Sequence, residues 1–368
     1  MKIAHLTSAH KRYDTRIFIK QCRSLAAAGE NVSLLVADDL GDEVRDGVQI
    51  LDVGAARGRL NRMLKVPLRI YRKAVELDAT VYHLHDPELL FIGLRLLRIG
   101  KKVVFDAHED VPKQILSKPY LNKAITPLLS NVYSLFERYA CSRLTGIITA
   151  TPFIRDKFLK VNPQTLDINN FPLLSELGGV TSWEEKKNEV CYIGGISVAR
   201  GAVEIVNALQ FINSDVRLNL AGNFIESDLR EKLKQSPGWP RVSELGFLNR
   251  VGVRQVLDRS LAGLVTLHPL ENYLDALPVK MFEYMAAGIP PVASNFPLWR
   301  KIIEEADCGL CVNPKEPREI AEALDYLLKN PAEAKRLGDN GRKAAVEKYN
   351  WEFEELKLLR FYKDVLKC

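Results

Sequence analysis

The sequence predicts an α/β protein made of two doubly wound domains, each a parallel β-sheet covered by helices. Short apolar, β-branched runs alternate with longer amphipathic runs along nearly the whole chain, which is the pattern of strands joined by crossover helices. The chain has 368 residues, which is more than one hydrophobic core usually serves. An irregular polar stretch near the middle separates two such series, so we expect two Rossmann-like units.

The first domain is predicted over residues 1–170. The expected strands are Lys2–Thr7, Asn31–Ala37, Val48–Val53, Val81–His85, Val103–Ala107 and Gly146–Ala150. The expected helices are Thr15–Ala28, Leu60–Leu77, Glu88–Ile99, Lys123–Ser142 and Phe153–Lys160. Strands separated by helices favour parallel pairing, because a parallel pair needs a crossover connection.

Residues 171–188 are predicted to be a linker, because asparagine, proline, glycine and lysine cluster there. The second domain follows over residues 189–350. Its expected strands are Val190–Ile193, Val216–Ala221, Val242–Phe247, Ala262–Leu267, Pro291–Ser294 and Gly309–Val312. Its expected helices are Val203–Phe211, Asp228–Gln235, Arg250–Arg259, Val279–Ala287, Arg318–Leu328 and Pro331–Tyr349, with a last helix pattern at Glu352–Val365.

Composition narrows the function classes. The chain has 52 basic and 46 acidic residues, a net charge of +6, and no nucleic-acid motif, so anionic small molecules or a membrane surface are the expected partners. We find neither an apolar run of the ~18 residues that a membrane span needs nor a secretory h-region, and expect a cytoplasmic protein. The scattered cysteines predict reduced thiols, and the Cys308–Cys311 CxxC predicts a buried strand rather than a zinc site.

The most specific segment runs from His268 to Val292. Pro278 suits the first turn of a short helix, whose free amides after a strand form a cradle for phosphate. Glu283 lies about a turn and a half further on, where a carboxylate can accept both hydroxyls of a ribose. Gly288 ends the helix before another buried strand. The segment therefore predicts a nucleotide-binding site.

These residues resemble the GT4 family of retaining glycosyltransferases, which have the GT-B architecture of two Rossmann-like domains facing a central cleft. The resemblance rests on Glu283-Tyr-Met-Ala-Ala-Gly288-Ile-Pro, the second half of the family's motif. It implies that Glu283 holds the ribose of the donor nucleotide, and that the first acidic residue, which contacts the donor sugar, corresponds to Asp275. Aspartate is one methylene shorter than the family's glutamate. The helix at 351–368 then corresponds to the family's terminal helix, which packs back on the first domain.

The family's second donor element is a glycine-rich turn that carries an arginine and a lysine for the diphosphate. Here the turn reads Gly194-Gly195-Ile-Ser-Val-Ala-Arg200. Gly195 stands at the arginine's place and Arg200 at the lysine's, so one cation is missing. Lys280, at the start of the Glu283 helix, is the candidate that replaces it. A guanidinium can hold phosphate with two hydrogen bonds, which suits Arg200 to this role.

In the first domain, the resemblance implies that His108 is the active-site histidine near the donor sugar. The loop after the first strand corresponds to the family's acceptor-side loop and carries Asp14 and Arg16, although Asp14 also fits a helix N-cap. His85 and Glu109 end two further strands and are the other acceptor-side candidates. His83 and His85 share one strand face, so a packing role stays open for either.

A metal site is the alternative interpretation of this histidine-rich region. His83, His85, Asp86, His108, Glu109 and Asp110 have suitable donor atoms, but they come from two loops without a ligand spacing that defines a metal geometry. We expect no metal and no cofactor.

A basic segment at residues 57–73 has seven cations and no acid, interleaved with apolar residues. It predicts either a helix that docks on anionic lipid at the inner face of the cell membrane, or a solvated helix face.

The resemblance as a whole implies a metal-independent transferase. It moves a sugar from a UDP- or GDP-linked donor to a glycan or lipid-linked glycan in bacterial polysaccharide synthesis, with retention of configuration. Two alternatives stay open: an epimerase or hydrolase that acts on nucleotide sugars with the same fold, and a non-catalytic nucleotide-sugar-binding subunit.

Overall fold

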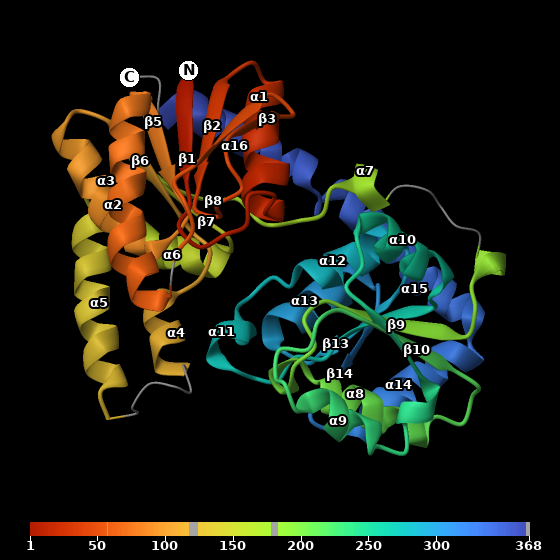
Figure 1. The fold of residues 1–368 in the computed structure, drawn as a ribbon. Helices are drawn as coiled ribbons and strands as arrows, with labels where there is room; N and C mark the ends of the chain where they lie inside the picture. Colours follow the sequence, from red (N-terminus) through yellow and green to blue (C-terminus); the bar gives the residue numbers. More distant parts are fainter. Residues whose placement is uncertain (57, 118–123, 178–182, 366–368) are drawn as a thin grey trace. The chain divides into compact units, whose positions relative to one another are not determined.

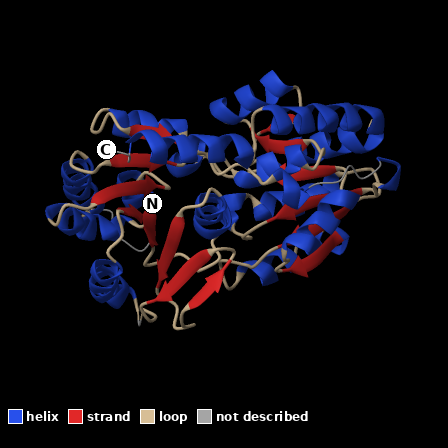
Figure 2. Ribbon diagram, turned by 90° about the horizontal axis from the view of Figure 1, so that it is seen from above, coloured by secondary structure: helices blue, strands red, loops and turns tan. Residues whose placement is uncertain are grey.

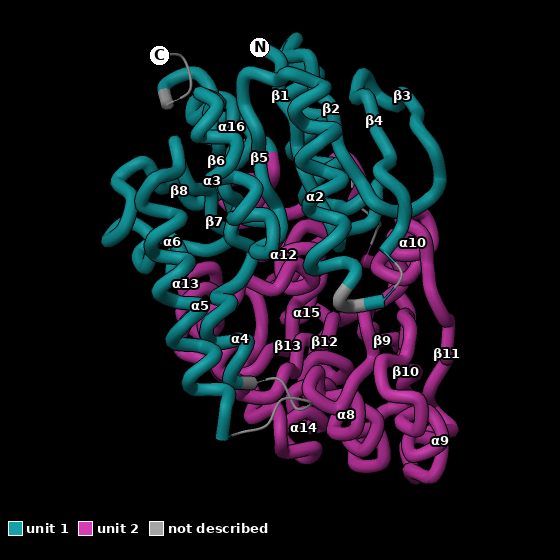
Figure 3. The backbone as a smooth tube through the Cα atoms, turned by 60° about the vertical axis from the view of Figure 1, so that its left-hand side comes forward, with its two compact units in different colours: residues 1–170, 352–368 teal, residues 171–351 magenta. Residues whose placement is uncertain are grey.

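The computed structural model describes residues 1–56, 58–117, 124–177 and 183–365. The chain divides into two compact units, which Figure 3 colours separately. Unit 1 comprises Met1–Asn170 with Glu352–Cys368, and unit 2 comprises Phe171–Trp351. Each unit has a β-sheet between layers of helices (Figures 1 and 2), so the predicted α/β class with two doubly wound sheets is confirmed.

Among the described residues, unit 1 has an eight-stranded sheet in the order β3-β4-β2-β1-β5-β6-β7-β8. The strands are β1 (Lys2–Leu6), β2 (Asn31–Val36), β3 (Glu43–Arg45), β4 (Val48–Asp52), β5 (Val81–Leu84), β6 (Lys102–Ala107), β7 (Gly146–Thr149) and β8 (Thr165–Asp167). The pairings are parallel except for β3, which pairs antiparallel with β4. The short strands β3 and β8 were not predicted.

Strand β3 forms a hairpin with β4 through a turn that the sequence does signal. Asp46 and Gly47 both have positive φ, 50° and 77°, as the two central residues of a type I′ hairpin turn require. An Asp-Gly pair between short β-compatible runs is a strong hairpin signal. The strand itself has only three residues, which is too short for a periodic pattern.

The helices of unit 1 cover both faces of its sheet. They are α1 (Arg23–Ala27), α2 (Arg59–Leu77), α3 (Leu90–Arg98), α4 (Val111–Ser117), α5 (Thr126–Cys141), α6 (Pro152–Leu159) and α16 (Trp351–Val365), with a 3-10 turn η2 (Pro87–Leu89). Helices α2, α3, α5 and α6 share one hydrophobic core with alternate residues of β1 and β5, including Leu6, Tyr82 and Leu84. His5, His83 and His85 alternate with these residues, so they face the other side, where Tyr362 of α16 contacts His83.

The first helix differs from its prediction. We expected one helix over Thr15–Ala28, but Thr15–Cys22 is a π-helix, η1, which continues as α1. The wider turn of a π-helix brings side chains five residues apart to one face. As a result, Arg16 and Gln21 both reach Asp106 at the end of β6.

Within the described residues, unit 2 has a six-stranded parallel sheet in the order β11-β10-β9-β12-β13-β14. The strands are β9 (Glu189–Ile193), β10 (Arg217–Ala221), β11 (Val242–Gly246), β12 (Ala262–Val265), β13 (Pro291–Ser294) and β14 (Leu310–Val312). Numbered from β9, this is the strand order 3-2-1-4-5-6 of a dinucleotide-binding fold. Apart from its edge strands β3 and β8, the sheet of unit 1 repeats the same order.

Helices also cover both faces of the second sheet. They are α7 (Leu174–Leu177), α8 (Ala202–Ala208), α9 (Leu229–Lys234), α10 (Arg250–Arg259), α11 (Glu271–Leu274), α12 (Val279–Ala286), α13 (Pro297–Ala306), α14 (Pro317–Lys329) and α15 (Pro331–Glu347). Short 3-10 turns are η3 (Trp183–Glu185), η4 (Val198–Arg200), η5 (Leu209–Phe211) and η6 (Trp239–Arg241). Helices α8, α9 and α14 pack in one core, and α10, α12, α13 and α15 pack in another.

Four helices lie in segments for which we had predicted none: α4, α7, α11 and α13. Helix α7 lies in the stretch predicted to be a linker, and the structure places this stretch in unit 2. Helices α7 and α11 have only four residues each, too few for a periodic signal. Helix α13 does have the usual signals, because Pro297 opens it and Trp299, Ile302 and Ile303 line its buried face. Of the helices in the described part of the chain, none is long and apolar enough to cross a membrane.

Candidate functional site

Each unit has polar groups gathered at the point where its strand order reverses. Ligands of open α/β sheets bind at the carboxyl ends of the strands beside this switch point. In unit 1 the switch point lies between β1 and β5, and in unit 2 it lies between β9 and β12.

In unit 1, Asp86 at the end of β5 organises the loop that follows β1. Its carboxylate accepts hydrogen bonds from the amide of Ser8 at 2.6 Å and from the hydroxyl of Thr7 at 2.8 Å. His10 Nδ1 lies 3.0 Å from its other oxygen. Burial alone would raise the pKa of Asp86, but His10, Thr7 and Ser8 hold it well below its usual range. The loop is therefore held around an ionised carboxylate.

Asp14 and Arg16, two predicted acceptor-side residues, have structural roles. Asp14 accepts hydrogen bonds from the amides of Arg16 and Ile17 and is the N-cap of η1, the alternative that the sequence left open. Arg16 is 4% exposed, and its guanidinium holds both oxygens of Asp106 and the carbonyl of Ile168. These bonds occupy the guanidinium of Arg16, and its predicted role on the acceptor side stays a prediction.

Asp106 is a residue that the sequence analysis missed. It is fully buried, and it accepts hydrogen bonds from Arg16 and Gln21. His85 Nδ1 and His108 Nε2 lie 3.5 and 3.4 Å from its Oδ2. Burial alone would raise the pKa of Asp106, but Arg16 and the two histidines hold it well below its usual range. An aspartate inside an otherwise apolar strand was the signal, because such a charge is buried only with partners.

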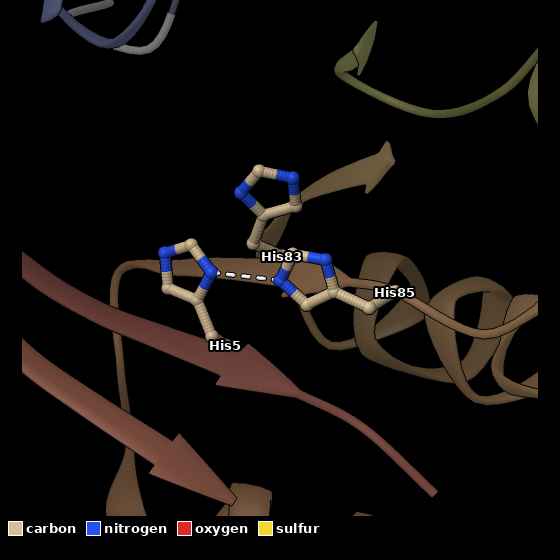
Figure 4. Close-up of side chains that lie close together, drawn as sticks. All are labelled: His5, His83 and His85. Carbon is tan, nitrogen blue, oxygen red and sulfur yellow. Dashed lines mark hydrogen bonds between the residues drawn. The ribbon is translucent and has the colours of Figure 1, made fainter. Parts of the chain in front are cut away.

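Three buried histidines form a cluster next to Asp106, and His85 is the member of this cluster that lies near its carboxylate. Figure 4 shows His5, on β1, beside His83 and His85, which come from the β5 segment. The Nδ1 of His5 lies 2.8 Å from the Nε2 of His85, and the Nδ1 of His83 lies 2.7 Å from the hydroxyl of Tyr362. Burial lowers the pKa of His85 to about 3. Burial also lowers the pKa values of His5 and His83. His85 is only 2% exposed, and its predicted role on the acceptor side stays a prediction.

His108 and Glu109 are open to solvent. The side chain of His108 is 20% exposed, and Glu109 is exposed at the surface. Because Asp106 is ionised, the nearby Nε2 of His108 is assigned as an N–H donor. Asp106 therefore positions the histidine that the resemblance implicates in catalysis.

Two groups of side chains have enough ligand atoms for a metal ion: His5, His83 and His85, and His85, Asp106 and His108. In the first group the rings of His83 and His85 are stacked with 18° between their planes, and those of His5 and His85 with 17°. Ring nitrogens accept in the plane of the ring, so stacked rings do not direct their lone pairs at one centre. In the second group Arg16 already pairs with Asp106. The geometry therefore fits hydrogen bonding better than metal binding.

In unit 2, the turn after β9 meets two cations. The Nη1 of Arg200 lies 3.3 Å from the carbonyl of Gly195. A Cβ at Gly195 would lie 2.6 Å from that Nη1, and a Cβ at Gly194 would lie 3.2 Å from the Nζ of Lys280. The two glycines thus leave room for two cationic side chains that come from elsewhere. The arginine that the family has at position 195 would occupy the place of Arg200.

The environment of the Lys280 ammonium is unusual for a lysine, because the ammonium is buried and lacks a hydrogen-bond partner among the described residues. Its nitrogen lies 3.8 Å from the centre of the Tyr192 ring. Burial, together with the charge of Arg200, lowers the pKa of Lys280 to about 7. A buried, unpaired ammonium is costly unless an anion binds it. This group therefore has the properties of a binding site for an anion.

A cavity of about 300 Å³ adjoins this turn. It is lined by Ile193, Gly194, Gly195, Ala221, Gly222, Asn223, Phe247, Leu248 and Val253. Gly222 has a φ of 144°, and a Cβ there would come within 1.8 Å of the carbonyl of Gly194. Only glycine permits this close approach of the two loops. The cavity has the volume and apolar walls that suit a flat heterocycle beside the cations.

Glu283 does not stand alone. It accepts a hydrogen bond of 2.7 Å from the Nη1 of Arg250, whose Nε forms an ion pair of 2.8 Å with Glu176. Arg250 lies at the start of α10 and Glu176 lies in α7. Both were missed by the sequence analysis, since they are distant in sequence from Glu283. Arg250 holds one oxygen of Glu283, which fixes the direction of its carboxylate.

The other predicted donor residues surround the start of α12. Pro278 is the N-cap of α12 rather than part of its first turn, and Lys280 and Glu283 follow on the same helix. Asp275 ends α11 in the preceding loop. Thus Gly194, Gly195, Arg200 and Lys280 lie together in unit 2, while the roles of Asp275 and Glu283 toward a ligand stay predictions.

Comparisons with known proteins agree with this arrangement. The family of glycosyl transferases group 1 matches residues 177–344, and a glycosyl transferase 4-like domain matches residues 17–166. A phosphatidyl-myo-inositol mannosyltransferase of Mycobacterium leprae is 24% identical over 319 residues, which is 83% of this chain and 79% of that protein. An MMP alpha-(1->4)-mannosyltransferase of Mycolicibacterium hassiacum is 27% identical over 177 residues, 46% of this chain and 43% of the relative.

Solved structures share the fold. Sucrose-phosphate synthase from Thermosynechococcus elongatus superposes with a TM-score of 0.79 at 19% identity, covering 99% of this chain and 98% of that one. Anabaena HepE in complex with UDP superposes with a TM-score of 0.74 at 14% identity, covering 99% and 100%. The protein thus has the GT-B fold, two Rossmann-like domains with a polar site at each switch point. It belongs to the GT4-like glycosyltransferases and is an enzyme of that class.

Proposed function

We propose that this glycosyltransferase uses a nucleoside-diphosphate sugar, UDP- or GDP-linked, as its donor. The observation that carries the proposal is the buried ammonium of Lys280, which lies with Arg200 at the Gly194–Gly195 turn and has no hydrogen-bond partner among the described residues. A diphosphate would neutralise both cations, and charge-assisted hydrogen bonds to phosphate are among the strongest in proteins. The adjoining cavity would take the base. HepE, solved with UDP and with UDP-glucose, has the same fold.

The residues around this turn support a mechanism that needs no cofactor. Arg200, Lys280 and the N-terminus of α12 at Pro278 would stabilise the negative charge that develops as the bond between the sugar and the diphosphate breaks. Glu283, held by Arg250, would accept the ribose hydroxyls. An acceptor hydroxyl would form the new glycosidic bond and pass its proton to the departing phosphate oxygen, with retention of configuration. The role of His108 at the donor sugar, with Asp106 as its positioning residue, belongs to the same proposal, as does Asp275.

The acceptor that we propose is a hydroxyl of a glycan or lipid-linked glycan in bacterial polysaccharide synthesis. The relatives that act on phosphatidyl-myo-inositol and on sugars support a carbohydrate or lipid-linked acceptor. Glu109 is exposed in unit 1 and is one of the acceptor-side candidates. A peripheral contact of residues 57–73 with anionic membrane is part of the proposal.

The test measures binding of UDP, GDP, CDP and ADP by calorimetry, and then turnover of the matching nucleotide sugars with and without glycan acceptors. We expect one nucleoside diphosphate to bind preferentially. We also expect Glu283→Ala to abolish that binding while circular dichroism stays unchanged, and Glu271→Ala, an exposed neighbour, to bind normally. Unchanged affinity in Glu283→Ala would refute the assigned site. Equal donor consumption with and without acceptor would indicate a hydrolase or epimerase, and binding without turnover a non-catalytic subunit.

A further inference from the structure

Helix α5 of unit 1 exposes a strip of apolar residues and buries several polar ones. Leu128, Leu129, Val132, Leu135 and Tyr139 are 65%, 43%, 57%, 70% and 50% exposed, and we call them the α5 ridge. Their spacing places them along one side of the helix. A surface helix usually turns one apolar stripe toward the core, and α5 has this exposed strip in addition to Ala140 and Cys141, which lie in the core.

Polar contacts on the inward side of α5 set the rotation of this helix. Thr126, Ser130 and Glu137 are buried there. The Ser130 hydroxyl donates to the carbonyl of Pro112 at 2.9 Å, and Glu137 forms an ion pair of 2.7 Å with Lys157. These contacts fix the rotation of the helix, so the ridge is kept outward. A contiguous exposed apolar strip of this kind marks an interaction surface.

Neighbouring helices extend this surface. Helix α3 contacts both α2 and α5, and the three lie on the same side of the sheet (Figure 1). Helix α2 packs Val66 and Ile70 in the core and also exposes Met63, Leu64 and Leu68, at 49%, 65% and 43%. Phe91 of α3 is 51% exposed, and the Arg95 guanidinium lies over its ring. We call the ridge and these residues the α2–α5 face.

Most of the charges around the face are positive, with Glu76 near the end of α2 as an exposed acidic residue. Lys65 and Arg72 on α2 and Arg138 on α5 are exposed. The sequence has no acidic residue from 57 to 75 or from 111 to 136. At the C-terminal end of α5, the Arg143 guanidinium lies 3.7 Å above the Tyr139 ring. Amphipathic aromatics and cations at the margin of an apolar strip are the side chains that settle at the level of lipid headgroups.

We infer that the α2–α5 face docks on the surface of a bilayer that contains anionic lipid. The ridge would enter the boundary between headgroups and acyl chains, while Lys65, Arg72, Arg138 and Arg143 would bind lipid phosphates. A second copy of this chain fits less well, because a two-fold contact would place cations of the α2–α5 face opposite their own copies with few acids to pair them. The inference widens the predicted contact at residues 57–73 and does not depend on the transferase reaction.

The experiment measures co-sedimentation of the full chain with phosphatidylcholine vesicles, with and without phosphatidylglycerol. We expect binding to the anionic vesicles that weakens as salt rises. The ridge variant, Leu128→Ser with Val132→Ser and Leu135→Ser, should bind at least tenfold more weakly. Its matched control is Leu40→Ser with Val44→Ser, two equally exposed apolar residues, at 70% and 75%, beside and in β3, and it should bind normally.

A charge variant tests the second half of the inference. Lys65→Gln with Arg72→Gln should weaken binding about fivefold for each cation removed, since a surface cation contributes about 1 kcal/mol near anionic lipid. Lys301→Gln with Lys335→Gln, two exposed cations of unit 2, should have no effect. Circular dichroism of each variant shows that it is folded, and nucleotide binding by unit 2 separates this test from that of the donor site.

Three outcomes would overturn the inference. One is a wild-type chain that ignores anionic vesicles or binds neutral vesicles equally well. Another is a ridge variant that sediments as the wild type does. The last is a ridge variant that dissociates an oligomer seen by light scattering while vesicle binding is absent, which would assign the face to a second copy.

Discussion

The two switch-point regions have the same strand order and opposite electrostatic states. In unit 1, Asp86 and Asp106 are buried and each is surrounded by donors, so its charge is already satisfied. In unit 2, Lys280 is buried and its ammonium lacks a hydrogen-bond partner among the described residues. The same strand order therefore supports two different arrangements of charge. In unit 1 the buried carboxylates are paired with donors, and in unit 2 a buried ammonium has no hydrogen-bond partner among the described residues.

The largest expected effect is the loss of stability of unit 1 as the pH falls. The pKa values of His5, His83 and His85 are lowered mainly by burial, so the folded unit holds them neutral while the unfolded chain binds protons below about pH 6.5. Their stabilisation is therefore present above pH 6.5 and is lost as the pH falls toward the lowered values. We expect the free energy of unfolding of unit 1 to fall by up to about 4 kcal/mol per pH unit, roughly 1.4 for each histidine.

Hydrogen exchange of β1 and β5 measures this loss. All four tryptophans, Trp183, Trp239, Trp299 and Trp351, lie in unit 2, so tryptophan fluorescence follows the other unit as an internal control. The variant His83→Phe should lower the dependence of the free energy of unfolding of unit 1 on pH by about 1.4 kcal/mol per pH unit, the contribution of one proton. A slope that His83→Phe leaves unchanged would show that other groups govern the acid response.

The next largest effect is expected from replacing Lys280 in unit 2, which should weaken nucleotide binding without lowering stability. Lys280→Met removes a buried ammonium, so we expect the nucleotide-free protein to be at least as stable as the wild type in thermal unfolding. Nucleoside-diphosphate binding should weaken about 100-fold, as for other buried charged partners that lose about 2.7 kcal/mol. A variant that is destabilised and yet binds normally would show that Lys280 has a packing role only.

The pH dependence of nucleotide binding also tests the role of the Lys280 ammonium. The pKa of free Lys280 is about 7, and a bound diphosphate favours its charged form. Binding above pH 7 should therefore take up a proton, and the dissociation constant should rise up to tenfold per pH unit. Calorimetry in two buffers of different ionisation enthalpy counts this proton. In Lys280→Arg, whose side chain does not titrate in this range, the uptake should disappear.

The smallest of these effects concerns the orientation of Glu283. Arg250→Met frees the carboxylate from its 2.7 Å hydrogen bond, and we expect nucleotide affinity to fall about tenfold, the value of one hydrogen bond to a charged group. Arg254→Met is the matched control, because Arg254 lies one turn further along α10 and pairs with Asp258 instead. Equal effects of the two substitutions would refute a positioning role for Arg250.

Much of the fold follows from local patterns. Apolar runs placed the interior strands of both sheets, and glycine and proline marked the segment around 171–188. The elements that were missed, such as β3 and α11, have only three or four residues. Such segments have too few side chains for a periodicity, and their conformation is set by turns and neighbours. The π-helix η1 shares its amphipathic pattern with an α-helix, so only the hydrogen bonds of the folded chain distinguish the two.

From the sequence alone, the α/β class and the glycosyltransferase family could be predicted, and residues around Gly194 and Lys280 could be named as donor-site candidates, because these inferences depend on short motifs. Only the tertiary structure decided which charges are satisfied. It made Arg16 and His85 partners of Asp106, brought Arg250 and Glu176 to Glu283, and turned the leucines of α5 outward. The physical reason is that burial and electrostatic pairing depend on neighbours distant in the chain, whose positions no local pattern contains.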